Sequence, residues 1–274
     1  MNSHHENQTC EIFRDNSEGS ASVPMVAVAI HDGRSIRDEL QPLLAISAED
    51  RFREEDAFTS VWTHIAPTRV VATRSRFEVD FNRPRHRSVY LTPKDAWGLK
   101  VWQSALTTEA IEHSRKLYDA FYAQMRLLFD ELAAQHGQFF VYDLHSYNHR
   151  RGGPEAPFDS PEDNPQINIC TGGMDLDRCG VVVDRFEEAL LSYNFLGGQL
   201  DVRRNVRFRA TRFSRWVHEN YPGVGISLAL EISKFYMDEW TGEPDEQLMH
   251  EITSALAATV DPVSKSISSL TPRT

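Results

Sequence analysis

The chain has 274 residues, of which 41% are hydrophobic and 25% are charged, as in an ordinary globular protein. This length suits one large α/β domain and is marginal for two. The formal net charge of −11 argues against a nucleic-acid partner. The sequence has no run of about 18 apolar residues, so we expect no membrane-spanning helix and no membrane partner.

Both ends of the chain are polar. Residues 1–22 are rich in Asn, Ser, Glu and His and lack the apolar stretch of a signal peptide, so we expect a flexible N-terminal segment. Residues 263–274 are expected to form a frayed tail, which leaves 23–262 as a single domain. The three scattered cysteines provide no disulfide framework and favour a reducing compartment, so we expect a cytoplasmic protein.

Short apolar runs that are closed by polar residues are typical of buried strands. In chain order, we predict strands over 25–30, 69–73, 139–144, 167–170 and 225–230. Between them, helices are predicted over 36–44, 58–65, 107–136, 186–196 and 248–258. Strands that alternate with helices in this way predict an α/β fold with a mostly parallel sheet.

The longest of these helices has the clearest boundaries. Thr107 or Thr108 can cap its start, and Gly137 is a typical residue just beyond a helix end. Its apolar side chains recur on one helical stripe. They are Ile111, Leu117, Phe121, Met125, Leu128 and Leu132.

Three of the predicted strands end in residues that can bind or serve a metal ion. His31 follows the first strand, His145 follows the strand after the long helix, and Glu231 follows the last strand. In open α/β sheets, ligands bind in the crevice outside the carboxyl ends of the strands. Two imidazoles and several carboxylates at one such crevice are the raw material of a catalytic zinc site.

Each of these acidic and imidazole groups also has a structural interpretation. Asp143 and His145 share one face of a strand end, so the carboxylate can orient the imidazole with or without a metal ion. Asp56 precedes an apolar stretch and is either a helix N-cap or a metal ligand. Glu231 interrupts a buried strand, so it needs a partner: a water that it serves as general base, or a cation such as Lys234.

Clustered arginines stand out in a chain this acidic. An arginine fork binds a carboxylate in bidentate fashion, which predicts a small anionic substrate. Arg76 and Arg83 are the best candidates for that contact, and Asn82 and Arg150 are further candidates.

The ordered set of these motifs resembles the N-formylglutamate amidohydrolase family. The motifs are His31-Asp-Gly33, Glu54-Glu-Asp56, Ser75-Arg-Phe-Glu-Val-Asp-Phe-Asn-Arg-Pro84, Asp143-Leu-His-Ser146, Ala229-Leu-Glu231 and Lys234-Phe-Tyr-Met-Asp-Glu-Trp-Thr-Gly242. The resemblance covers residues 24–242. The Asn-Arg-Pro stretch and the Asp-x-His-Ser strand end are its most specific parts.

The resemblance implies a three-layer α/β/α hydrolase with a mostly parallel mixed sheet, related to zinc carboxypeptidases and other zinc exopeptidases. It implies one zinc ion, whose ligands would be His31, Asp56 and His145. Glu231 would be the catalytic base. Arg76 and Arg83 would hold the carboxylate of the substrate.

The function that we expect is zinc-dependent hydrolysis of an N-acyl, formyl-like amide of an acidic amino acid or a related small carboxylate. Two alternatives stay open. Ala210-Thr211 replaces a glycine pair that is common in the family, so the chain is alternatively a non-catalytic relative that binds an anionic metabolite. The other alternative is a zinc exopeptidase or deacylase that acts on a larger substrate. The sequence also leaves open the identity of the metal, the choice among Glu54, Glu55 and Asp56 as ligand, and the oligomeric state.

Overall fold

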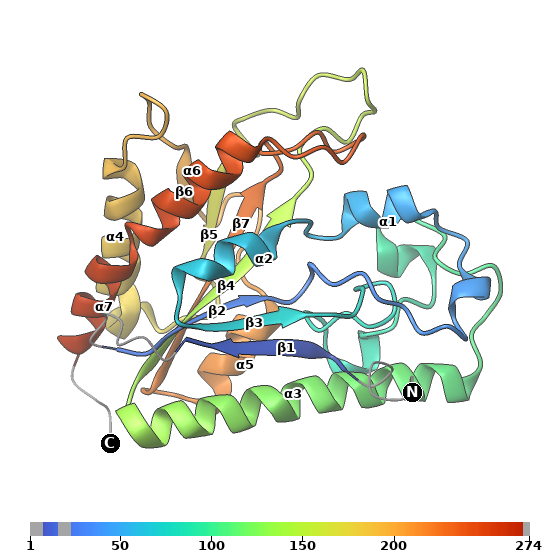
Figure 1. Cartoon of the computed structure of the whole chain (residues 1–274), viewed down its shortest axis with the longest axis horizontal. Coiled ribbons are helices and arrows are strands. Elements are labelled where there is room, and N and C mark those ends of the chain that lie inside the picture. Colours follow the sequence, from blue (N-terminus) through green and yellow to red (C-terminus); the bar gives the residue numbers. More distant parts are fainter. Residues whose placement is uncertain (1–7, 16–22, 271–274) are drawn as a thin grey trace.

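The computed structural model describes residues 8–15 and 23–270. In this part of the chain, seven strands form one mixed sheet in the order β1-β3-β2-β4-β7-β5-β6 (Figure 1). The strands are β1 (Cys10–Arg14), β2 (Met25–Ala29), β3 (Thr68–Ala72), β4 (Phe139–Tyr147), β5 (Ile167–Cys170), β6 (Val202–Arg204) and β7 (Gly225–Ser233). The four central strands, β3, β2, β4 and β7, are parallel, whereas β1 pairs with β3 and β5 pairs with β7 in antiparallel fashion. The predicted mostly parallel α/β sheet is confirmed.

Helices cover both faces of the sheet. The α-helices are α1 (Ala48–Glu54), α2 (Thr59–Trp62), α3 (Thr108–His136), α4 (Leu176–Ser192), α5 (Arg212–Asn220), α6 (Glu246–Ala257) and α7 (Val260–Ser268). Side chains of α3 and α5 pack on one face, and side chains of α2, α4, α6 and α7 pack on the other. This arrangement is the predicted three-layer α/β/α architecture (Figure 1).

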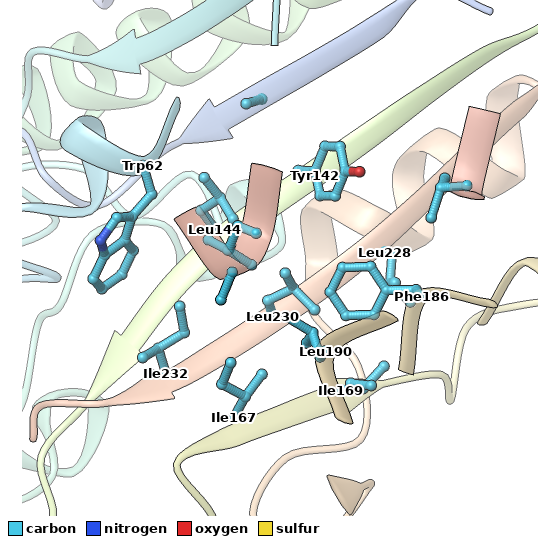
Figure 2. Close-up of a cluster of buried hydrophobic side chains, with 14 of the residues drawn as sticks. Trp62, Tyr142, Leu144, Ile167, Ile169, Phe186, Leu190, Leu228, Leu230 and Ile232 are labelled. Atoms are coloured by element: carbon cyan, nitrogen blue, oxygen red, sulfur yellow. The ribbon is translucent and has the colours of Figure 1, made fainter. Parts of the chain in front are cut away.

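The apolar alternation of β4 explains the two packed layers. Tyr142 and Leu144 point into the larger core with Phe186 of α4, whereas Val141 points into the core under α3. Figure 2 shows the larger core, in which side chains of β4, β5 and β7 lie against α4 and Trp62. Because both faces of the central strands are covered, apolar residues face both cores along most of their length, and the polar residues of β4 and β7 gather toward their carboxyl ends.

The predicted ends of the long helix are confirmed. The Thr107 side chain accepts a hydrogen bond from the backbone N–H of Ala110, and Gly137 ends α3 with a left-handed backbone conformation (φ 74°). Glycine adopts this conformation without the steric cost of a side chain. The chain therefore turns directly from α3 into β4, which carries one of the candidate ligands.

Two predictions about the chain ends are wrong. Cys10–Arg14 form an edge strand paired with β3 rather than a flexible segment, because Cys10 packs inward opposite Ala72. The residues beyond 262 continue as α7 because Val263 and Ile267, one helical turn apart, are fully buried. The remaining residues of these predictions, 1–7, 16–22 and 271–274, lie outside the described residues.

Two helix predictions also need correction. The stretch 36–44 forms a hydrogen-bonded turn and one 3₁₀ turn, Gln41–Leu43, rather than an α-helix. Pro42 provides no backbone N–H to continue a helix, and Ser35, just before the stretch, is paired with Arg74 at the end of the sheet. The helix predicted over 186–196 is α4, which begins ten residues earlier, where Asp175 caps its start. The helix predicted over 58–65 is present as α2 followed by a 3₁₀ turn, Thr63–Ile65. In the described part of the chain, no helix has the length and apolarity needed to cross a membrane.

Candidate metal centre

Three predicted site residues meet at the carboxyl ends of the central strands. His31 follows β2, and His145 lies directly opposite Glu231 in the parallel pair of β4 and β7. Asp56 reaches the same place from the loop after α1. The parallel arrangement brings the strand ends to one edge of the sheet, which explains why residues far apart in the sequence converge.

The two histidines and Asp56 surround one point. Oδ2 of Asp56 lies 2.9 Å from Nδ1 of His145 and 3.3 Å from Nδ1 of His31. One ligand atom from each of the three residues lies within 4.8 Å of the others, and all three residues are buried. Of the three neighbouring acids, Asp56 is the one whose carboxylate contacts both histidines, since Glu54 contacts Asn148 and Glu55 contacts Ser75.

A second carboxylate lies behind each imidazole. His31 Nε2–H donates to Asp80 (2.8 Å), and His145 Nε2–H donates to Asp143 (3.0 Å). When the imidazoles are neutral, each Nε2 carries the hydrogen atom, so both Nδ1 lone pairs face the Asp56 carboxylate. Three electron-rich atoms converge on one point, and a cation or a shared proton is needed to relieve their repulsion. The residues present therefore fit a small divalent cation such as zinc.

The pKa values of Asp56 and His145 are shifted by each other and by the neighbouring charges. Burial would raise the pKa of Asp56, but the nearby His31, the hydrogen bond from His145 and Arg76 hold it well below its ordinary value. Burial would lower the pKa of His145, but Asp143 and Asp56 raise it well above its ordinary value. His145 thus holds a proton beside Asp56, in the place where a metal cation would compete for the same lone pairs.

For Glu231, burial has a larger effect on the pKa than the neighbouring charges have, in contrast to Asp56. Burial raises its pKa from 4.5 to about 8, and the neighbouring His145 opposes that shift. The carboxyl of Glu231 therefore exchanges its proton near neutral pH, as a general base and acid must do.

A cavity of about 490 Å³ opens beside this cluster. Its lining combines the predicted ligands and base with several cations and three aromatic side chains, Trp97, Tyr147 and Phe208. The lining residues are His31, Glu54, Asp56, Arg76, Asn82, Trp97, His145, Ser146, Tyr147, Asn148, Arg151, Arg207, Phe208, Glu231 and Lys234. A cavity with four Arg and Lys side chains, in a protein of net charge −11, favours a small anionic ligand.

The family model for N-formylglutamate amidohydrolase matches residues 23–237, which is most of the chain. The chain belongs to the N-formylglutamate amidohydrolase family. The motifs that suggested this resemblance are the same segments that carry His31, Asp56, His145 and Glu231 to the cavity.

Two solved structures share the fold of this family member. An N-formylglutamate amidohydrolase from Ralstonia eutropha JMP134 has a TM-score of 0.70 and 18% sequence identity, covering 95% of this chain and 98% of its own. A gene product from Agrobacterium tumefaciens has a TM-score of 0.64 and 18% identity, covering 97% of each chain. None of the curated proteins compared with the chain is significantly similar to it.

Arg76, which is predicted to bind the substrate carboxylate, lines the cavity. Its guanidinium contacts Asp56 (3.2 Å) and Asp80 (3.5 Å) and lies 4.9 Å from the ring centre of Trp97. The two carboxylates and the aromatic ring fix its orientation. Since Arg76 also lines the cavity, it is a fixed cation in reach of an anionic ligand.

The other three predicted substrate-binding residues have different surroundings. Arg83 pairs with Asp80 (3.5 Å) behind Arg76 and is not among the lining residues of the cavity. Asn82 lines the cavity, but its side-chain oxygen accepts the first backbone N–H groups of α5 (2.6 and 3.1 Å). Arg150 pairs with Asp238 (3.4 Å) and lines a separate cavity of about 900 Å³. Among the described residues, Arg76 and Asn82 line the cavity beside the candidate metal centre, whereas Arg83 and Arg150 do not.

Sequence reasoning did not single out several residues of the site. Asp80 lies inside the Asn-Arg-Pro motif. Its contact is with His31, 49 positions earlier in the chain, so it depends on the fold and not on a local pattern. Trp97, Arg151 and Arg207 come from three further loops. Trp97 is an exposed tryptophan with a left-handed backbone conformation (φ 52°), which is unusual for this residue type. This feature is visible in the structure and not in the sequence.

Asp32, which follows the first histidine, and Thr211, of the Ala210-Thr211 pair, both have structural roles near the site. Asp32 accepts the backbone N–H groups of Phe58 (2.8 Å) and Ser60 (3.3 Å) and so supports the start of α2. Thr211 caps α5 and donates its hydroxyl to Asp143 (2.6 Å). The Ala210-Thr211 replacement therefore supports the carboxylate that orients His145.

Proposed function

We propose that this protein is a zinc-dependent amidohydrolase that removes a small, formyl-like acyl group from an acidic amino acid or a related small carboxylate. The observation that carries the proposal is the convergence of His31, Asp56 and His145 next to Glu231 in one cation-lined cavity. Membership of an amidohydrolase family supports the reaction class.

His31, Asp56 and His145 would hold the metal ion, with Asp80 and Asp143 fixing the two imidazoles. When bound, a zinc ion at this place supplies a Lewis acid that lowers the pKa of a water molecule to about 7. Three protein ligands of this kind, two histidines and one carboxylate, would be typical of a catalytic rather than a structural zinc site.

Glu231 would act twice in the reaction. It first takes a proton from the attacking water as the oxygen adds to the amide carbonyl. It then delivers this proton to the amine nitrogen as the carbon–nitrogen bond breaks. Burial of Glu231 raises its pKa toward neutrality, which suits both steps.

Arg76 would hold the substrate by its carboxylate. Its guanidinium is already oriented by Asp56 and Asp80, so little side-chain entropy is lost when a substrate binds. Arg151 and Arg207 at the exposed side of the cavity would attract the second negative charge of an acidic amino acid.

The proposal is tested by assaying purified protein with N-formyl and N-acetyl amino acids and short peptides, before and after treatment with a chelator. We expect hydrolysis of an N-acyl acidic amino acid that is lost with the chelator, restored by zinc and abolished in His145→Ala. Unchanged hydrolysis in His145→Ala would contradict the mechanism. Turnover of peptides alone would instead indicate an exopeptidase, and binding without any turnover would indicate a non-catalytic relative.

A further inference from the structure

The segment that follows the catalytic strand has no part in the mechanism above. Residues 234–242, which we call the clasp segment, leave the end of β7 three positions after Glu231. They form the last of the sequence motifs, Lys234 to Gly242. Their side chains lie against residues 52–57, the stretch that delivers Asp56 to the metal centre.

Two buried side chains of the clasp segment bind the backbone on either side of Asp56. The Lys234 ammonium donates to the carbonyl oxygens of Arg53 and Glu55, the latter at 2.8 Å. The Tyr236 hydroxyl donates to the carbonyl oxygen of Ala57 at 2.8 Å. The carbonyl groups of every second residue from Arg53 to Ala57 therefore accept hydrogen bonds from the clasp segment.

The burial of these donors shows how closely the two segments are packed. Lys234 is 1% exposed and Tyr236 is fully buried. In the described part of the chain, no carboxylate lies within ion-pair distance of the Lys234 ammonium. A buried ammonium that is satisfied by backbone carbonyls is costly, because its charge is poorly compensated. Such a residue is expected where its hydrogen bonds fix a functional loop.

Further contacts extend the interaction along both segments. The Arg53 guanidinium lies 4.1 Å from the ring centre of Trp240. Gly242 has a left-handed backbone (φ 80°), and a Cβ atom there would lie 2.6 Å from the ring of Phe52. A larger residue at position 242 would therefore force the two segments apart.

The opposite side of the Asp56 backbone is also held. The backbone N–H of Asp56 donates to the carbonyl of His31 at 3.1 Å, and the N–H of Phe58 donates to Asp32 at 2.8 Å. The ligand loop is therefore fixed between the first histidine and the clasp segment, with the Asp56 carboxylate directed at His145.

We propose that the clasp segment positions Asp56 for metal binding, with Lys234 and Tyr236 as its positioning residues. This inference rests on the proposed role of Asp56 as a ligand. It connects the strand that bears the base to the loop that bears the carboxylate, so both reach the cavity in a fixed relation.

The test compares Tyr236→Phe with Tyr142→Phe. Both tyrosines are buried and each gives its hydroxyl to one partner, but Tyr142 contacts Thr259 in the core, away from the ligand loop. In metal-free protein, we expect amide hydrogen exchange across residues 55–58 to be about tenfold faster in Tyr236→Phe, and unchanged there in Tyr142→Phe. Exchange in β4 should stay as in the wild type.

Zinc affinity, measured by competition with a chelator, gives the second readout. We expect a loss of about 10-fold in Tyr236→Phe and a larger loss in Lys234→Met, with none in Tyr142→Phe. If Lys234→Met does not fold, Lys234→Gln replaces it, because the amide keeps one donor. Unchanged loop exchange in Tyr236→Phe and in the Lys234 variant would overturn the inference. Wild-type protein that binds no zinc would refute the proposed function, whereas the exchange experiment would still decide the role of the clasp segment.

Discussion

The two histidines of the cavity owe their orientation to carboxylates that do not face the cavity. Asp80 and Asp143 each accept a hydrogen bond from Nε2, which leaves Nδ1 directed at Asp56. Asp143 is itself held by hydroxyls of Thr211 (2.6 Å) and Ser214 (3.1 Å). A chain of contacts therefore connects the start of α5 to the candidate metal centre.

Replacing Asp143 by Asn should weaken metal binding without unfolding the protein. The amide cannot match the charge of the carboxylate behind His145, so we expect zinc affinity to fall by about 10- to 100-fold. Equilibrium dialysis against zinc measures this change. Asp119→Asn, which alters an exposed ion pair with Arg85, is the control and should bind zinc as the wild type does.

Replacing Glu231 by Gln should separate metal binding from catalysis. Gln keeps the shape of the side chain but cannot take a proton, so we expect kcat to fall by about 10²- to 10⁴-fold with the metal still bound. Steady-state kinetics together with metal analysis check this expectation. A Glu231→Gln protein that retains wild-type kcat would show that another group is the base.

At the scale of elements, His218 connects α5 to β7, the strand that carries Glu231. His218 of α5 donates from Nδ1 to the carbonyl of Gly173 (3.0 Å) and accepts the backbone N–H of Ser227 at Nε2 (3.0 Å). Nε2 can accept this N–H group only while the ring is neutral. Burial favours the neutral ring and lowers the pKa of His218 below its ordinary value. The contacts of His218 are therefore structural.

This connection predicts a pH dependence of stability. The folded-state pKa of His218 lies below the ordinary value of about 6.5, so below that pH the unfolded chain binds a proton that the folded chain does not. The contribution of His218 is therefore present above pH 6.5 and is lost as the pH falls. Urea unfolding between pH 7 and pH 5 should show a shallower loss of stability in His218→Gln. Equal slopes in the two proteins would contradict this assignment.

Elements with local signals were predictable, and those with non-local causes were not. The α3 helix has its stripe, its Thr107 cap and its terminal glycine within its own sequence. The edge strand at Cys10–Arg14 and helix α7 are short segments with weak local signals, and they are ordered by packing on distant partners. Short-range patterns contain no record of such pairing.

At the scale of the whole molecule, the sheet topology explains why so much of the centre was predictable. Apolar runs that end in His31, His145 and Glu231 indicate parallel strands, and parallel strands share one catalytic edge. The substrate-binding arginines were less predictable because their location depends on loop conformation. Arg83 and Arg150 do not line the cavity, whereas Arg207 does. The loop that carries Arg207 is held next to β5, because the backbone N–H of Arg207 donates to the side-chain oxygen of Asn168 (2.9 Å).

The central claim is that His31, Asp56 and His145 bind one metal ion at this shared edge. Its most direct test is the metal content of purified wild-type protein, His31→Ala and Asp56→Ala, determined by mass spectrometry of the elements after dialysis with limiting zinc. We predict one zinc ion per wild-type chain and little in either variant, with the variants still folded by circular dichroism. Wild-type protein that retains no metal, or variants that retain as much as the wild type, would contradict the account.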